Sequence, residues 1–140
     1  MIQLIIGEKG KGKTKVLLDK ANTEIRSANG NIVYIDKSAQ HMYELNNKVR
    51  LIDATTFPLS DSDEFVGFLC GIISQDHDLE QMYLDSFLKI ACIKDAEDVE
   101  NTLNKIERIS SDYHVNFIIS ISLTRNQLPD SMKENVIAEL

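Results

Sequence analysis

Residues 7–14 combine glycine and lysine in the spacing of a phosphate-binding loop. They read Gly-Glu-Lys-Gly-Lys-Gly-Lys-Thr, which fits G-x-x-x-x-G-K-[ST] with Gly7, Gly12, Lys13 and Thr14 on the fixed positions. Glycine lets the main chain approach an anion closely and adopt positive φ angles. The first N–H groups of a helix after such a loop have no partner inside the helix and carry its positive dipole end. We therefore expect the amides of residues 10–14 to hold the phosphates of a nucleoside triphosphate.

The side chains of the loop predict separate roles in holding phosphate and metal. Lys13 is expected to reach the β- and γ-phosphates, and the Thr14 hydroxyl is expected to ligate Mg²⁺. Lys9, Lys11 and Lys15 would focus positive potential on the same place in an otherwise acidic chain, although each has the alternative of being a solvated surface lysine. The expected cofactor-binding residues are Gly7, Glu8, Lys9, Gly10, Lys11, Gly12, Lys13, Thr14 and Lys15.

A loop of this kind must lie between a buried strand and a helix, and the surrounding sequence supplies both. Residues 2–6 are a short apolar run, and apolar residues recur at helical spacing over 13–28. Further on, β-prone runs alternate with helical patterns. This predicts an α/β fold of three layers, with a mostly parallel five-stranded sheet flanked by helices in a single domain. The expected strands are 2–6, 31–36, 49–53, 81–85 and 115–122, and the expected helices are 13–28, 62–75, 97–112 and 130–139, with a short helical turn at 38–45.

Two aspartates at predicted strand ends are candidates for the metal and the catalytic step. Asp85 closes the strand 81–85, where a P-loop protein places the acidic residue that holds Mg²⁺ through its water shell, and the alternative is an ordinary strand-end aspartate. Many P-loop ATPases place a water-orienting glutamate directly after this aspartate, but this chain has Ser86 there. Asp36, at the end of the second strand, is the substitute, and a solvated or capping aspartate is an equal alternative. The expected catalytic residues are thus Lys13, Asp36 and Asp85, and the expected metal ligands are Thr14 and Asp85.

The order of these elements resembles the nucleotide-binding core of RecA-type ATPases, within the P-loop NTPase class. The resemblance rests on the loop at 7–14, the strand ends Ile35-Asp36 and Asp85-Ser86, and the run from Phe117 to Leu123. It implies that the loop strand lies beside strand 115–122, which in turn neighbours the Asp85 strand. It also implies that polar residues after the last strand sense the γ-phosphate, namely Ser122, Thr124, Arg125 and Asn126. The chain is also similar to short P-loop proteins of Gram-positive bacteria that are sometimes labelled twitching-motility ATPases.

Composition and charge limit the partners and the compartment. A net charge of −7 argues against nucleic acid as the main partner. The longest apolar run, 65–73, is far shorter than the ~20 residues of a spanning helix, and no signal-peptide pattern precedes the loop, so we expect a soluble, cytoplasmic protein. Cys70 and Cys92 lie in apolar stretches and are expected to be free thiols. The chain ends before a strand can form beyond 2–6, so we expect that strand to be a sheet edge that binds a second copy or a protein partner.

Two functions fit these residues. The first is binding of ATP with Mg²⁺ and its weak hydrolysis, and the alternative is a nucleotide-dependent switch or adaptor that a protein partner completes. Ser86 and the scarcity of arginine favour the switch, whereas Asp36 and Thr14 favour the ATPase. ATP is expected rather than GTP, because the chain has no Asn-Lys-x-Asp run for guanine. A phosphotransferase acting on a small metabolite is a third function, for which the sequence indicates no acceptor pocket or lid.

Overall fold

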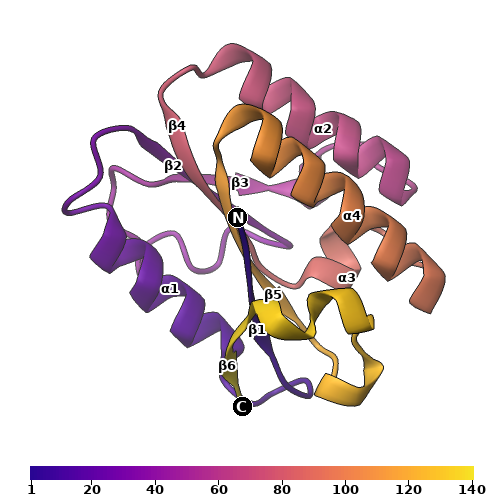
Figure 1. Cartoon of the computed structure of the whole chain (residues 1–140). Helices are drawn as coiled ribbons and strands as arrows, with labels where there is room; N and C mark the ends of the chain where they lie inside the picture. Colours follow the sequence, from indigo (N-terminus) through magenta and orange to yellow (C-terminus); the bar gives the residue numbers. More distant parts are fainter.

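Six strands form one sheet through the middle of the computed structural model, which describes residues 1–140. The spatial order is β3-β2-β4-β5-β1-β6, and every neighbouring pair is parallel (Figure 1). The carboxyl ends of all six strands therefore lie along the same edge of the sheet, which is where ligands bind in open parallel α/β sheets. The strands are β1 Ile2–Ile6, β2 Asn31–Asp36, β3 Arg50–Asp53, β4 Leu79–Leu84, β5 Asn116–Ile121 and β6 Val136–Glu139.

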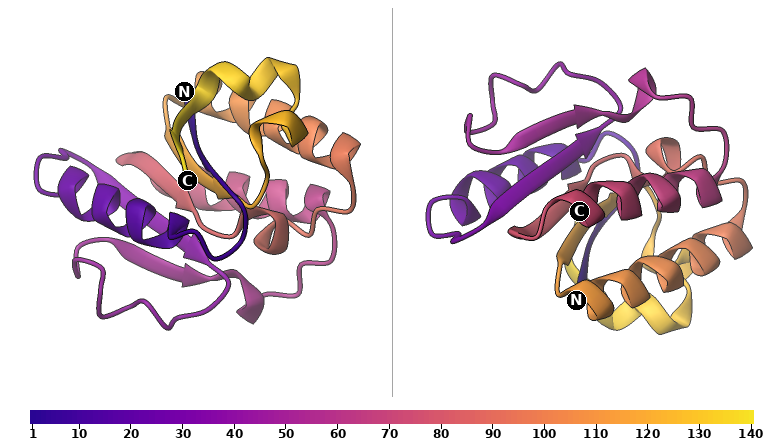
Figure 2. Two further views of the ribbon diagram at one scale, coloured as in Figure 1. Left: turned by 90° about the horizontal axis from the view of Figure 1, so that it is seen from below. Right: turned by 90° about the horizontal axis from the view of Figure 1, so that it is seen from above.

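The α-helices cover both faces of the sheet and make three layers. They are α1 Lys13–Glu24, α2 Ser62–Gln75, α3 Phe87–Ile90 and α4 Ala96–Tyr113, and the 3₁₀ helices are η1 Ala54–Thr56, η2 Arg125–Gln127 and η3 Asp130–Asn135. Helix α1 lies on one face, and α2 and α4 lie together on the other (Figure 2). Both long helices of the second face begin at an aspartate that accepts a hydrogen bond from the main chain three residues on, Asp61 for α2 and Asp95 for α4. None of the helices is long and apolar enough to cross a membrane.

The alternation of side chains along each strand divides the core in two. In β2, Val33 and Ile35 pack with the apolar residues of α2 and α4, whereas Ile32 and Tyr34 pack with those of α1. Continuous burial of β2 and β5 on both faces explains why their sequences read as unbroken apolar runs. The α/β class, the helices on both faces and the five expected strands are confirmed, and so is the expected neighbourhood of β1, β5 and β4.

The expected helix over 130–139 is wrong. Residues 130–135 form η3, and residues 136–139 form β6, which pairs with β1. The Asn135 amide also donates a hydrogen bond to the Ile2 carbonyl at 2.8 Å. Unpaired main-chain groups along β1 would be costly beside the core, and pairing them outweighs the helical tendency of a short segment. The sheet therefore has six strands instead of five.

Two further expectations, for the sheet edge and for residues 38–45, are also wrong. Strand β1 lies between β5 and β6, so its expected position at the sheet edge is wrong. The reason for expecting a partner at β1 is therefore lost, and the outer strands are β3 and β6.

Residues 40–44 form successive turns, and no helix is present at 38–45. Asn22 of α1 holds this segment in place, because its side chain donates to the Glu44 carbonyl at 2.8 Å and accepts from the Asn46 amide at 2.7 Å.

Candidate functional site

The loop between β1 and α1 is built by glycines with positive φ. Gly7, Gly10 and Gly12 have φ of 146°, 84° and 94°, and Gly12 is the residue that precedes α1. The main-chain N–H groups of residues 8–15 donate no hydrogen bond within the chain, and no side chain caps the start of α1. The loop therefore presents a row of unpaired donors beside the positive end of a helix, which is the arrangement that binds anions.

Lys13, the first residue of α1, folds back over this loop. Its ammonium donates to the carbonyl of Glu8 at 2.9 Å, and only 8% of the residue is exposed. Burial lowers the pKa of the Lys13 ammonium, and the negative charge of Asp85 partly opposes that change. The lysine is thus held at the loop by the Glu8 carbonyl, and its expected contact with the β- and γ-phosphates stays a prediction.

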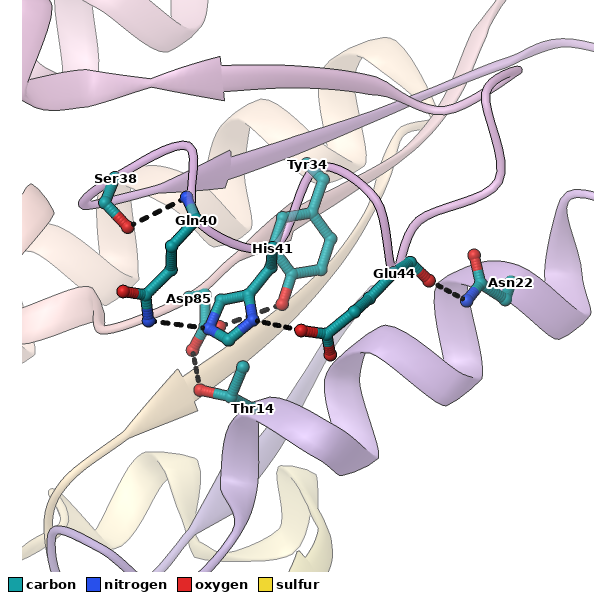
Figure 3. Close-up of polar contacts among 8 residues, drawn as sticks. All are labelled: Thr14, Asn22, Tyr34, Ser38, Gln40, His41, Glu44 and Asp85. Carbon is teal, nitrogen blue, oxygen red and sulfur yellow. Dashed lines mark hydrogen bonds and ion pairs between the residues drawn. The ribbon is translucent and has the colours of Figure 1, made fainter.

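Asp85 follows β4 and is 2% exposed, with both carboxylate oxygens occupied. Its Oδ1 accepts from the Thr14 hydroxyl at 3.3 Å, and its Oδ2 accepts from the Tyr34 hydroxyl at 2.8 Å (Figure 3). The Oδ1 atom also accepts from the Ser120 hydroxyl at 2.6 Å. Three hydroxyl donors from three different elements fix the orientation of this carboxylate. Burial, followed by the charge of Asp85, raises the pKa of Tyr34, so its hydroxyl keeps its proton and remains a donor. Thr14 and Asp85, far apart in sequence, are therefore brought together as expected.

Asp36 ends β2 close to Asp85 and is also only 2% exposed. Its Oδ1 accepts from the Lys37 main chain at 2.7 Å, but its Oδ2 has no hydrogen-bond partner. Burial and then the charge of Asp85 raise the pKa of Asp36 to about 6. This carboxyl can therefore take up or release a proton near neutral pH, which is a property of general bases.

A hollow of about 370 Å³, the loop hollow, opens at the carboxyl end of the sheet against these groups. Its lining residues are Lys9, Gly10, Gly12, Lys13, Thr14, Lys37, Asp85, Ser86, Leu88, Lys89, Ser120 and Ser122. Four lysines and one aspartate give the lining a positive balance within a chain of net charge −7. Such a concentration of positive charge favours a small anion over a neutral ligand.

Some predicted residues lie outside the loop hollow, namely Gly7, Glu8, Lys11, Lys15 and Asp36. Exposed Lys15 pairs with Asp19 on α1 at 3.4 Å. Of the four polar residues expected after β5, Ser122 lines the hollow, whereas Arg125 pairs with Glu139 of β6 at 3.2 Å. Thr124 and Asn126 do not line it either.

Sequence reasoning missed Lys37, Leu88, Lys89 and Ser120. Lys37 directly follows β2 and Ser120 lies near the end of β5, whereas Leu88 and Lys89 lie on α3 after β4. Their positions beside the loop depend on the strand order. Of these four residues, the sequence could have indicated Ser120, because it is a polar residue inside the otherwise apolar run 117–121. Its hydroxyl donates to Asp85 and accepts from the Ser86 main chain at 3.0 Å, and so joins the ends of β4 and β5.

Comparison with known proteins assigns no relative. No protein-family model matches the chain, and no curated protein matches it.

Proposed function

We propose that the chain is a P-loop nucleotide-binding protein of RecA-like strand order that binds ATP with Mg²⁺ in the loop hollow and hydrolyses it slowly. The observation that supports this most directly is the row of unpaired N–H groups of residues 8–15 beside a hollow with four lysines. Water can solvate exposed amides, but a phosphate satisfies several of them at once and also neutralises the lysines. The position of β5 between β1 and β4 agrees with the RecA-like order.

The oxygens near the start of α1 fit Mg²⁺. Thr14 contributes a hydroxyl and Asp85 a carboxylate that are already 3.3 Å apart, and Mg²⁺ prefers oxygen ligands while keeping several waters. In this proposal Thr14 ligates the ion directly, and Asp85 binds it through water. The bound ion would neutralise negative charge on the β- and γ-phosphates. Lys13 would exchange its hydrogen bond with the Glu8 carbonyl for the phosphates.

Hydrolysis would depend on Asp36. Its Oδ2 is a buried carboxylate oxygen without a hydrogen-bond partner, and its raised pKa suits a residue that orients water and accepts its proton. The alternative, a switch that hydrolyses only when a partner completes the site, is favoured by a different observation. The cations of the loop hollow are lysines, and Arg125 is engaged by Glu139.

Calorimetric titration with ATP, ADP and GTP in the presence of Mg²⁺ tests the binding. Lys13→Ala is expected to weaken ATP binding by about 10- to 100-fold, because a charge-assisted hydrogen bond contributes about 1.5–3 kcal/mol. Lys20→Ala is the matched control, since Lys20 lies on the same helix, pairs with Glu24 at 3.6 Å and carries the same charge. Equal ATP affinities of the two variants, or no ATP binding at millimolar concentration, would refute the proposal.

Phosphate release separates the enzyme from the switch. Asp85→Asn is expected to weaken the Mg²⁺ dependence of ATP binding, whereas Asp36→Asn is expected to leave binding intact and to stop phosphate release. Release that is negligible in the unaltered chain and in both variants would support the switch and exclude the ATPase.

A further inference from the structure

A second hollow lies next to the loop hollow, between α3, the start of α4 and the turn after β5. We call it the α3–α4 hollow. Its volume is about 530 Å³, within the range of ~300–1,000 Å³ that is typical of small-molecule sites. Its lining residues are Leu88, Ile93, Lys94, Asp95, Ala96, Val99, Leu123, Asn126 and Gln127. Leu88 lines both hollows, so a molecule in the second would lie against the wall of the first.

The floor of this hollow is apolar and incompletely covered. Val99 is buried in the main core, whereas Leu88, Ile93 and Leu123 pack against that core and are only partly buried. These side chains are aliphatic, and they come from α3, from the connection between α3 and α4 and from the segment after β5. A flat apolar ring placed over them would remove their remaining surface from water.

The rim supplies hydrogen-bonding groups with no net charge. Lys94 and Asp95 contribute opposite charges, and Asn126 and Gln127 contribute amides. The Gln127 carbonyl is already held by the main chain of Thr124 at 2.9 Å, which leaves its NH₂ group free to donate. The Asn126 side chain makes no hydrogen bond within the chain. Since the first turn of α4 is also acidic, the rim suits an uncharged ligand with polar edges better than an anion.

We propose that the α3–α4 hollow is a second binding site, for an uncharged heterocyclic molecule of nucleoside size. The ring would cover Leu88, Ile93 and Leu123, and its polar edge would pair with the amides of Asn126 and Gln127. Binding in this hollow does not require a nucleotide in the loop hollow. The inference therefore does not rest on the proposed function.

The test is a ¹⁵N–¹H NMR titration of the full chain with adenosine, cytidine, uridine and inosine, one at a time. These probes carry no phosphate and no negative charge, so the lysines of the loop hollow do not attract them. We expect saturable shifts from at least one nucleoside, centred on residues 88, 93–96 and 123–127. Ala96→Trp, at an exposed position that lines the hollow, would fill it and weaken this binding by at least about tenfold.

Glu97→Trp is the matched control, because Glu97 is the next residue of α4, is also exposed and does not line the hollow. It is expected to leave nucleoside binding unchanged. Absence of saturable shifts with all four nucleosides, shifts centred on residues 7–15, or equal effects of the two tryptophans would each overturn the proposal. ATP titration of Ala96→Trp, expected to match the unaltered chain, keeps the two sites distinguishable. If ATP fails to bind while a nucleoside still does, the proposed function fails and the second site stands.

Discussion

The hydrogen bond from Tyr34 to Asp85 allows a quantitative test of how the site is built. The Tyr34→Phe substitution removes one hydroxyl and leaves the ring, which is fully buried and stacks on Tyr83 with centroids 6.0 Å apart. The lost hydrogen bond, 2.8 Å long, is the only one that Asp85 Oδ2 accepts. Its loss leaves a buried carboxylate oxygen without a partner, and hydrogen bonds to charged groups contribute about 1.5–3 kcal/mol. We expect the free energy of unfolding to fall by about 2 kcal/mol.

Urea unfolding at neutral pH measures this loss, and Tyr83→Phe provides the reference. The Tyr83 hydroxyl donates to the neutral side-chain carbonyl of Gln81 at 2.7 Å, so its removal should cost about 1 kcal/mol. With a denaturant slope of about 1–3 kcal/mol per molar, the midpoint of Tyr34→Phe should fall by roughly 1 M urea, and that of Tyr83→Phe by about half as much. Both variants remove the same atom from neighbouring rings, so differences in volume and stacking cancel.

The ranking of the two variants decides the outcome. If Tyr34→Phe costs no more free energy of unfolding than Tyr83→Phe, then the hydrogen bond from Tyr34 does not hold the Asp85 carboxylate in its orientation. The proposed role of Asp85 in binding Mg²⁺ would then lose its structural support. A change in the denaturant slope of either variant would indicate altered compactness instead of a lost hydrogen bond.

Three further outcomes are expected. Because the pKa of Asp36 rises from 3.8 to about 6 on folding, the folded chain binds this proton more tightly, and its stability falls as pH rises from about 4 through about 6. Asp36→Asn should abolish this fall and be up to about 3 kcal/mol more stable than the unaltered chain at pH 7. Parallel pH profiles of urea unfolding for the two chains would contradict this. Gly30→Ala puts a Cβ 2.0 Å from the Asp78 carbonyl and should cost about 2–4 kcal/mol in thermal unfolding, whereas Gly67→Ala, with open space in α2, should stabilise by up to about 1 kcal/mol; a similar effect of both would be unexpected. Truncation after Asn135 removes β6 and exposes β1, so light scattering should show self-association, and a stable monomer would argue against the role of β6.

Lys13, Thr14 and Asp85 could be placed near each other from the sequence because local motifs identify them and parallel sheets share a common geometry. The loop motif specifies Lys13 and Thr14, and the end of an apolar run specifies Asp85. Parallel strands with helical crossovers bring their carboxyl ends to one edge, so these residues had to lie near each other. The 3.3 Å between the Thr14 and Asp85 oxygens agrees with that reasoning.

The parts that could not be predicted depend on contacts distant in sequence. Val136 to Glu139 is too short for periodicity to separate helix from strand, and its strand conformation is decided by unpaired groups on β1, more than a hundred residues away. Similarly, Ser120 is one polar residue in a buried strand, and it gains its role only because β5 lies beside β4. Lys89 lines the loop hollow through α3, a helix of four residues without a detectable pattern.

Substitution of Asp36 separates an ATPase from a switch better than substitution in the loop. The unpaired amides of the loop would bind nucleotide in either function, whereas Asp36 would be needed only for hydrolysis. A buried oxygen without a partner costs stability, and a nearby second carboxylate adds to that cost. Functional sites commonly carry such a penalty, and relieving it raises stability while lowering activity. For an ATPase, Asp36→Asn should therefore be more stable than the unaltered chain, bind ATP equally well and release no phosphate. For a switch, the same variant should gain the same stability while ATP binding and phosphate release both stay as they were, so one substitution measured in three assays separates the two functions.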